Sequence, residues 1–177
     1  MRIAMILAVD HSGSIGDGGE LPWRLGSDLR RFRRLTIGSG RNAVVMGRRT
    51  WESLPEKYRP LRERQNVVLT RQEGYEAPGC WVMGSWPAAR QRLASEGFEI
   101  TWIIGGGQLY DDLRGDVDEV HLTEVDATSS GAVTVDPFEP DAWERKVMER
   151  LEASESDEHA TTYLILRPKA TMDTTNS

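Results

Sequence analysis

The sequence predicts a single α/β domain built on a mostly parallel sheet with flanking helices. Short runs of aliphatic and β-branched residues alternate with helical patterns along the chain, which is typical of this class. The runs are apolar at nearly every position, as strands buried on both faces are. A length of 177 residues fits one domain with a sizeable core. We therefore expect one domain over residues 1–167 and a polar, disordered tail over residues 168–177.

The expected elements follow from local patterns taken in chain order. Aliphatic and β-branched runs predict strands at 3–9, 42–46, 66–70, 81–83, 100–104 and 117–125. Helical patterns lie between these strands at 28–37, 50–54, 87–95 and 108–113. Two later segments, 143–151 and 159–166, alternate apolar and polar residues on either side of an acidic turn. That alternation predicts a final antiparallel pair.

Composition and charge limit the possible functions. The net charge of −6 disfavours general nucleic-acid binding. Eight of the 22 basic residues nevertheless lie between Arg24 and Arg49, which favours an anionic small molecule in this part of the chain. The single cysteine, Cys80, excludes an internal disulfide, and the three dispersed histidines lack the spacing of metal ligands. We therefore expect no metal.

The chain is expected to be cytoplasmic and to make no contact with a membrane. Its opening apolar run is too short for the core of a signal peptide, and no run of about 18 apolar residues could span a bilayer. Cys80 has no basic neighbour in the sequence, so we expect a small buried residue there and not a reactive thiol.

The stretch from Ile15 to Phe32 joins a glycine-rich loop to an amphipathic helix. Ser27 is a good N-cap residue, so the helix is expected to begin at Asp28. Asp28 and Phe32 are spaced i, i+4 and share the face that points inward. Asp28 could simply complement the helix dipole, which is worth about 0.3 to 1 kcal/mol. It could instead bind a ligand, because an unpaired inward carboxylate would otherwise be costly.

Four loops lie where an α/β sheet usually binds ligands, beyond the carboxyl ends of its strands. They are the opening loop after Val9 and the segments Met46–Thr50, Leu69–Arg71 and Ile103–Tyr110. In the second loop a glycine and two arginines could hold a phosphate, although two solvated arginines would look the same. In the third, a cation stands at a strand end, which alone is a weak signal.

The fourth loop carries three consecutive glycines, Gly105 to Gly107, between a buried strand and a helix. Glycines there let the backbone approach a pyrophosphate closely. Tyr110 stands where the G-x-G-x-x-G fingerprint needs a glycine, and the chain has no G-x-x-x-x-G-K-[ST] loop. The loop therefore predicts a dinucleotide or phosphate site of another kind.

With these loops in order, the chain closely resembles dihydrofolate reductase of the bacterial chromosomal type. The resemblance covers residues 1–167, and its motifs lie at 8–10, 15–16, 21–23, 28–32, 45–54, 59–69, 103–110 and 122–123. Each motif alone is weak, whereas the ordered set at this spacing is specific. The resemblance implies one α/β domain with an eight-stranded, mostly parallel sheet.

The resemblance also implies an activity, the NADPH-dependent reduction of 7,8-dihydrofolate to tetrahydrofolate, a step of one-carbon metabolism. It implies a monomer that binds antifolate inhibitors. Asp28 would bind the pterin ring and promote protonation at N5, with Thr123 hydrogen-bonded to it. Trp23 would hold an active-site water, and Leu21 would lie on the mobile loop over the nicotinamide.

The resemblance assigns further residues to the two ligands. Arg64 would pair with a carboxylate of the substrate's glutamate, a contact that suits a planar guanidinium. The substrate is expected to contact Met5, Ile6, Asp28, Leu29, Phe32, Leu54, Leu61, Arg64, Ile104 and Tyr110. The cofactor is expected to contact Ile6, Ile15, Gly16, Gly47, Arg48, Arg49, Thr50, Leu69, Thr70, Arg71, Ile104, Gly105, Gly106, Gly107, Gln108 and Leu109.

Two departures from the family pattern concern the loops around the site. The loop between Asp10 and Ile15 is one residue longer than the commonest bacterial form, and Gly131 precedes Ala132 where the family often has a Gly-Asp pair. Closure of the mobile loop must therefore rely on other groups. For Asp28 we expect burial to raise the pKa more than the helix start and Thr123 lower it.

Two other functions fit part of the pattern. A pyrimidine reductase of riboflavin biosynthesis shares the fold and uses NADPH, but it should lack the Leu-Pro-Trp entry with Asp28 and Phe32. A non-catalytic nucleotide-binding module could retain the glycine loops. It would need neither Asp28 nor Arg64, and this chain has both.

Overall fold

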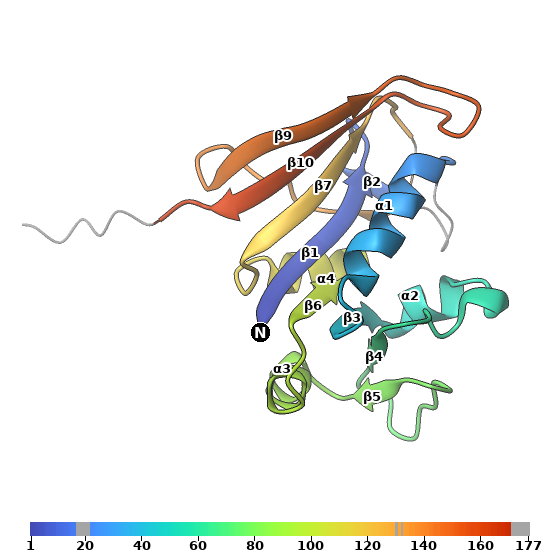
Figure 1. Ribbon diagram of the computed structural model, residues 1–177, viewed down its shortest axis with the longest axis vertical. Helices are drawn as coiled ribbons and strands as arrows, with labels where there is room; N and C mark the ends of the chain where they lie inside the picture. The colour runs from blue at the N-terminus through green and yellow to red at the C-terminus, as the bar shows by residue number, and fades with distance from the viewer. Residues whose placement is uncertain (17–21, 130, 132, 171–177) are drawn as a thin grey trace, which may run out of the picture.

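A twisted sheet of eight strands forms the centre of the computed structural model, which describes residues 1–16, 22–129, 131 and 133–170 (Figure 1). The strand order is β5-β4-β3-β6-β1-β7-β10-β9. The strands are β1 (Arg2–Val9), β3 (Asn42–Gly47), β4 (Gln65–Leu69), β5 (Trp81–Met83), β6 (Ile100–Ile103), β7 (Glu119–Val125), β9 (Trp143–Leu151) and β10 (Thr161–Pro168). Neighbours from β5 to β7 are parallel, whereas β10 is antiparallel to β7 and β9. The predicted sheet is confirmed.

Helices cover both faces of this sheet. They are α1 (Gly26–Ile37), α2 (Arg48–Ser53), α3 (Trp86–Ser95) and α4 (Gly107–Leu113), with a short 3-10 helix, η1 (Glu56–Tyr58). In Figure 1, α1 crosses in front of the strands and α4 lies behind them. The four helical patterns of the sequence are therefore confirmed, with boundaries that differ by up to two residues.

Alternate residues of the strands enter two hydrophobic cores. In β1, Ile3 and Met5 pack with residues of α3 and α4, whereas Ala4 packs on the other face with Trp51 of α2. All of these residues are buried. Because successive side chains of a strand point to opposite faces, a strand buried on both sides is apolar throughout. This explains the continuous apolar runs of the sequence.

The start of α1 differs from the expectation. The helix begins at Gly26 after Leu25, so Ser27 is not the N-cap. The cap comes instead from Asp157 in the β9–β10 loop, which accepts the Ser27 backbone N–H at 2.9 Å and the Ser27 hydroxyl at 2.7 Å. The prediction was wrong because a distant carboxylate caps the free N–H of Ser27 itself, so the helix begins at Gly26, two residues before the expected start.

A second, two-stranded sheet was not predicted. Strand β2 (Ser14–Gly16) pairs antiparallel with β8 (Val133–Thr134). Strand β2 has one apolar residue, Ile15, between a serine and a glycine, and β8 has only two residues, so neither shows the apolar run that predicted the equally short β5. At the other end of the chain, β10 reaches Pro168, one residue beyond the expected domain boundary, and the Lys169 N–H donates to the Ala142 carbonyl at 2.9 Å. The rest of the expected tail, residues 171–177, lies outside the described residues.

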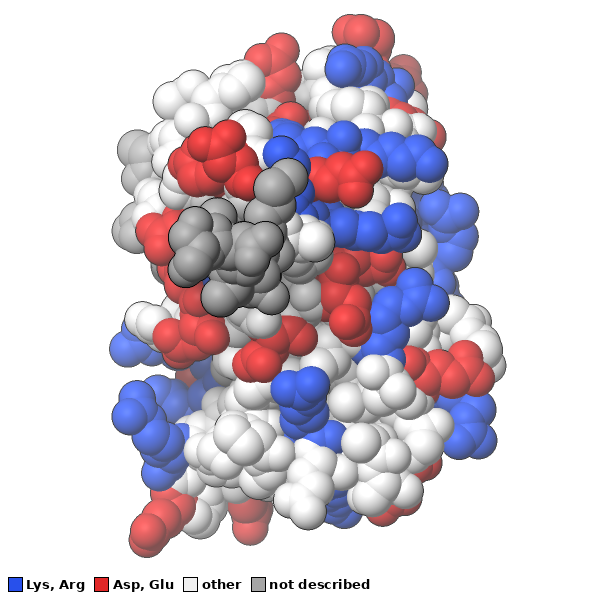
Figure 2. All heavy atoms as spheres, turned by 90° about the vertical axis from the view of Figure 1, so that its left-hand side faces the viewer, with Lys and Arg blue, Asp and Glu red and all other residues white. Residues whose placement is uncertain are grey.

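Charges of both signs lie next to one another on the face that is at the left in Figure 1 and faces the viewer in Figure 2. Strand β9 runs along this side and carries acidic and basic residues in close succession. In the part of the chain that the structure describes, no helix is both long enough and apolar enough to cross a membrane.

Replacing Asp157 by Asn is expected to lower the free energy of unfolding by about 1 kcal/mol, the typical value of a helix cap. Burial alone would raise the pKa of Asp157, but hydrogen bonds from Ser27, Ser156 and Ser154 outweigh it and lower the pKa to about 2. The contribution should therefore be complete above about pH 4 and be lost as the pH falls towards 2. Urea unfolding followed by circular dichroism measures it.

The matched control is Glu155→Gln, which removes the same charge from an exposed position in the same loop. It should leave stability within about 0.5 kcal/mol of the starting protein. Equal stability of the Asp157→Asn and Glu155→Gln variants would contradict the capping role of Asp157.

Candidate active site

The loops singled out in the sequence meet at one edge of the sheet. Strands β1, β3, β4 and β6 are parallel, so their carboxyl ends lie together. The Gly47 N–H after β3 donates to the Gly105 carbonyl after β6 at 2.8 Å, and the Thr70 N–H after β4 donates to the Met83 carbonyl at 3.0 Å. The expected grouping of Met46–Thr50, Leu69–Arg71 and Ile103–Tyr110 is thus present.

Asp28 lies in the first turn of α1 and points towards β7. The Thr123 hydroxyl donates to Asp28 Oδ1 at 2.6 Å, which the family resemblance implied. A second donor, Arg31 Nη1, reaches the same oxygen at 3.0 Å. Both donors bind one oxygen, and no described residue donates to Oδ2.

The pKa of Asp28 lies above its ordinary value. Burial is the largest cause and raises it, whereas the hydrogen bond from Thr123 and the charge and hydrogen bond of Arg31 lower it. The negative charge of Asp157 raises it further. The expectation that burial outweighs the hydrogen bond of Thr123 is confirmed in direction.

Apolar side chains from four segments of the chain form a wall on the same core cluster as Leu35 of α1, the helix that carries Asp28. Ile6, Leu54, Leu61 and Ile104 are only partly buried and pack on the core cluster of Met46 and Trp51. A partly exposed apolar wall is the usual lining of a small-molecule site. These four residues, all expected to contact substrate, are brought together.

Other expected wall residues differ in exposure. Phe32 is partly buried, and Leu29 is 55% exposed at the start of α1. Met5 is fully buried in the core on the opposite side of the sheet, so its side chain presents no surface to a ligand. Tyr110 is buried as well, and its hydroxyl donates to the Ile6 carbonyl at 2.9 Å, which fixes α4 against β1.

Arg64 is a partly buried guanidinium without a carboxylate partner among the described residues. Its Nε donates to the Arg62 carbonyl at 2.9 Å, Nη1 donates to the Thr36 hydroxyl, and the Phe32 ring centroid lies 5.8 Å from Cζ. Burial and the charge of Arg33 lower the pKa of Arg64. A cation held in this way is suited to an anionic group of a ligand.

The loop after β6 has the shape of a cradle that only glycine allows. Gly105 has a φ of +116°, and a Cβ atom there would lie 3.2 Å from the Tyr110 hydroxyl. A Cβ atom on Gly106 would lie 3.2 Å from the Thr50 hydroxyl. The absence of side chains leaves room for a ligand against the backbone. A nucleotide cofactor fits this part of the site.

The cations near the cradle are not equivalent. Arg48 forms an ion pair with Glu52 at 2.9 Å, so part of its charge is already neutralised. Arg49 and Arg71 are exposed and form no ion pair within the described part of the chain. Of the three predicted phosphate-binding arginines, these two are therefore the better suited to an anionic ligand.

The remaining expected cofactor residues lie close to the same loops. Ile15 and Gly16 belong to β2, and a Cβ atom on Gly107 would lie 3.7 Å from the Ile15 side chain. Leu109 is partly buried against the main core, whereas Gln108 is exposed and donates to Asp112 at 2.8 Å. Leu21 lies outside the described residues.

Trp23 anchors the entry to α1. It is 6% exposed and packs with Leu25 and Val125 in a small separate cluster. This cluster joins the segment before α1 to the end of β7, the strand that carries Thr123. Trp23 therefore fixes the position of the helix from which Asp28 projects.

Two residues of the site region were missed in the sequence. Arg31 is buried beside Asp28, and its i, i+3 spacing from an acid was the available signal. Asp10 is buried between two loops: Oδ1 accepts hydrogen bonds from Ser12 and Ser14, and Oδ2 accepts two from Ser129. The pattern of an aspartate two residues before a serine was its signal. Asp10 thus ties the loop after β1 to the loop after β7.

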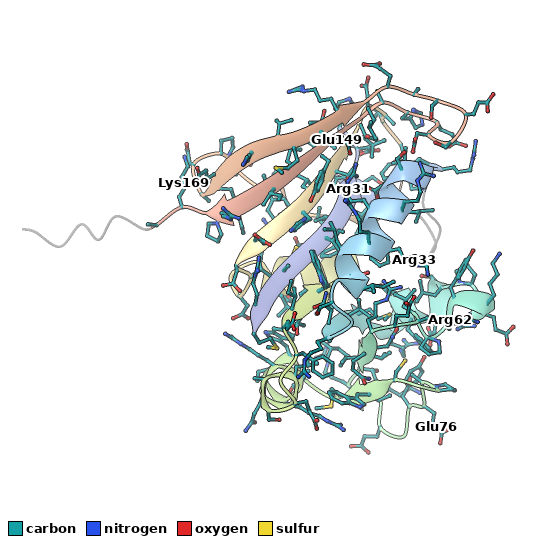
Figure 3. All side chains as sticks on the ribbon, viewed as in Figure 1. Arg31, Arg33, Arg62, Glu76, Glu149 and Lys169 are labelled. Carbon is teal, nitrogen blue, oxygen red and sulfur yellow. The ribbon has the colours of Figure 1, made fainter. Side chains whose placement is uncertain are left out.

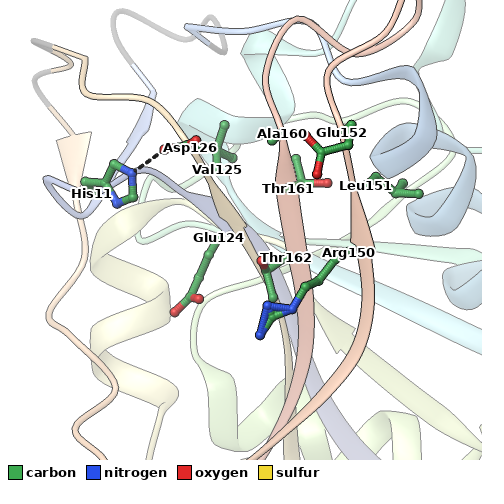
Figure 4. Close-up of a pocket in the computed structure, with 10 residues that line it drawn as sticks. All are labelled: His11, Glu124, Val125, Asp126, Arg150, Leu151, Glu152, Ala160, Thr161 and Thr162. Carbon is green, nitrogen blue, oxygen red and sulfur yellow. Dashed lines mark hydrogen bonds and ion pairs between the residues drawn. The ribbon is translucent and has the colours of Figure 1, made fainter.

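A separate hollow of 240 Å³ lies over β7, β9 and β10 (Figure 4). The exposed side chains of His11 and Asp126 are hydrogen-bonded at its border, with 2.9 Å between His11 Nε2 and Asp126 Oδ1. The residues that line it include neither Asp28 nor Arg64 nor the glycine cradle. In the described residues no cluster of potential metal ligands is present.

Comparison with known proteins places this geometry in a family. The family model for dihydrofolate reductase matches residues 2–167. A dihydrofolate reductase from Mycobacterium tuberculosis is 47% identical over 124 residues, which cover 70% of this chain and 71% of the relative. A putative dihydrofolate reductase from Caenorhabditis elegans is 40% identical over 135 residues, again 70% and 71% of the two chains.

A solved structure is similar over nearly the whole chain. Dihydrofolate reductase from Enterococcus faecalis, complexed with NADP(H) and RAB-propyl, has a TM-score of 0.82 and 31% sequence identity. The similarity covers 95% of this chain and 96% of that one. Fold and site together define an oxidoreductase with a nucleotide cofactor. The chain belongs to the dihydrofolate reductase family.

Replacing Asp10 by Asn is expected to destabilise the protein by about 1 to 3 kcal/mol, the cost of leaving buried donors unpaired. An amide has only one acceptor oxygen, so it cannot serve both Ser12 and Ser129. The measurement is urea unfolding at neutral pH. As a control, Asp126→Asn removes an equal charge from a side chain that is 73% exposed and should cost far less. Similar losses of stability in both variants would contradict the role of Asp10 in joining the loop after β1 to the loop after β7.

Proposed function

We propose that this enzyme reduces 7,8-dihydrofolate with NADPH and that Asp28 binds and orients the pterin ring. The observation that carries the assignment is the partly buried Asp28 carboxylate, held through Oδ1 by Thr123 and Arg31. Oδ2 receives no hydrogen bond from a described residue. In this arrangement Oδ2 of the carboxylate can accept hydrogen bonds from the N–H groups of a pterin ring.

The residues around Asp28 support a reduction. NADPH, when bound, supplies the hydride for pterin C6. The partly exposed walls formed by Ile6, Leu54 and Ile104 suit a flat aromatic ring and keep water away from it. Asp28, with its raised pKa, favours a proton at N5 through its contact with the ring.

Opposite ends of the site suit the anionic ends of the two ligands. Arg64, which has no carboxylate partner among the described residues, would pair with a carboxylate of the substrate's glutamate. Arg49, Arg71 and Thr50 would hold the cofactor's phosphates. The backbone of Gly105 and Gly106 would lie against the cofactor, because these residues have no side chain. Trp23 would hold a water near the pterin. Leu21 would act from the loop before α1, although it lies outside the described residues.

The alternatives raised by the sequence are less well supported. A non-catalytic nucleotide-binding module requires neither the partly buried Asp28 nor the partly buried Arg64. A riboflavin-pathway reductase should lack the Leu-Pro-Trp entry with Asp28 and Phe32, which this chain has. Inhibition by antifolates, a cytoplasmic location and a monomeric state stay predictions from the resemblance.

Replacing Asp28 by Asn is expected to lower hydride transfer to dihydrofolate at pH 7 by about 10²-fold or more, the usual contribution of a positioned acid or base. The fold and NADPH binding should be retained, because the cofactor's expected contacts lie on other loops. Oxidation of NADPH with and without dihydrofolate, followed by absorbance, measures the loss. Full activity of the folded variant would sink the assignment.

Replacing Arg64 by Gln is expected to raise KM for dihydrofolate roughly 10-fold to 100-fold, because a charge-assisted pair contributes about 1.5 to 3 kcal/mol. The kcat should change much less, since Arg64 would touch only the far end of the substrate. Arg62→Gln is the control, because Arg62 is exposed two residues away and contributes only its backbone carbonyl to Arg64. An unchanged KM in Arg64→Gln would remove Arg64 from the substrate site.

A further inference from the structure

A buried arginine lies directly beside Asp28, the proposed pterin-binding carboxylate. The Arg31 side chain is 5% exposed, and its guanidinium contacts three different elements. Nη1 donates to Asp28 on α1 at 3.0 Å, Nη2 donates to Glu149 on β9, and Cζ lies 4.2 Å from the centre of the Tyr163 ring on β10. Figure 3 shows Arg31 directed from α1 towards Glu149. The position of the guanidinium is therefore fixed from several sides.

The burial of this charge requires both carboxylates. An isolated buried cation would be strongly unfavourable, whereas one paired and stacked on an aromatic ring is tolerated. Glu149 is about half exposed, with 47% of its side chain accessible, whereas the Asp28 side chain is 25% exposed. Glu149 thus holds the outer end of the guanidinium, and the inner end is directed at Asp28.

The arrangement treats the two oxygens of Asp28 differently. Thr123 and Arg31 both donate to Oδ1, and Arg31 Nη1 also lies 3.5 Å from the Thr123 hydroxyl. Two donors on one oxygen fix the rotation of the carboxylate. Oδ2 is left for the donors of a ligand.

We propose that Arg31 is a positioning residue for the reduction, which holds Asp28 as an anion through Oδ1 and leaves Oδ2 for the pterin ring. This proposal rests on the proposed role of Asp28. Glu149 and Tyr163 hold Arg31 in place. Arg31 acts through Asp28 and does not contact the substrate.

The charges around Asp28 show why its cation matters. Burial and the negative charge of Asp157 both raise the pKa of Asp28, and among the described ionisable groups Arg31 is the principal cause that lowers it. The titratable and charged groups that face this region are Arg31, Arg34, Tyr110, His121, Glu149, Asp157 and Tyr163. The phenols of Tyr110 and Tyr163 have raised pKa values and stay neutral in the physiological range, and burial lowers the pKa of His121. They do not replace the charge of Arg31.

Two neutral variants, Arg31→Met and Arg31→Gln, test the proposal in the NADPH-bound enzyme. The readout is the pKa of the Asp28 carboxyl, followed by carbon NMR of aspartate-labelled protein, with the signal assigned by its loss in Asp28→Asn. A nearby opposite charge lowers a carboxyl pKa by about 1 to 3, so we expect its removal to raise the pKa of Asp28 by about 1 or more. Arg31→Lys should restore most of the difference.

Kinetics provide a second readout that a purely structural role would not move. The KM for dihydrofolate should rise as the pH falls and Asp28 becomes protonated. In Arg31→Met this rise should begin about 1 pH unit higher than in the starting enzyme. The reason is that a neutral Asp28 carboxyl no longer binds the ring as an anion. At a pH well above both values, the KM of the two enzymes should converge.

Glu149→Gln is the matched control, because it breaks the other ion pair of Arg31 and keeps the cation. It removes a negative charge, so it should not raise the pKa of Asp28. An unchanged Asp28 pKa in a folded neutral variant, or an equal rise in Glu149→Gln, would overturn the role of Arg31. Full activity of Asp28→Asn would instead overturn the proposed function, so the two failures are distinguishable.

Discussion

The partial burial of one carboxylate, Asp28, is the constraint on which the site depends. A charge removed from water must be compensated, and here Thr123 of β7 and Arg31 of α1 provide the compensation. The contact with Thr123 fixes the position and the rotation of α1 relative to β7. The Asp157 cap on Ser27 and the packing of Trp23 on Val125 fix the same end of the helix. The first turn of α1 is thus held from several directions.

The parallel sheet brings the loops after β3, β4 and β6 to one edge. The neighbouring strands β3, β6 and β1 each end in a loop on the same side of the sheet. The hydrogen bond from the Gly47 N–H to the Gly105 carbonyl joins two of these loops. The glycines after β6 leave room for a ligand against the backbone, whereas Arg64 directly precedes β4 and so offers a charge away from the carboxyl ends of the strands.

Much of the fold could be predicted from local patterns. Strands buried on both faces leave continuous apolar runs, and the last two strands leave an alternation, so the main sheet was recognised. The pair β2–β8 was missed because β2 has a single apolar residue between a serine and a glycine and β8 has only two residues, so neither forms an apolar run. The start of α1 was predicted at Asp28, two residues too late, because the cap comes from a residue 130 positions away from Ser27. Local patterns cannot report a partner at that distance.

Residue types alone are enough to recognise an inward acid at Asp28, a guanidinium at Arg64 and glycines at 105–107, because each type suits one task. The environment of that acid, in contrast, depends on how distant segments pack around it. Arg31 reads in the sequence as one of several arginines on a helix, yet it is buried between Asp28 and Glu149, which is 118 positions away. Burial and long-range pairing are properties of packing, and packing sets the charge and orientation of the carboxylate.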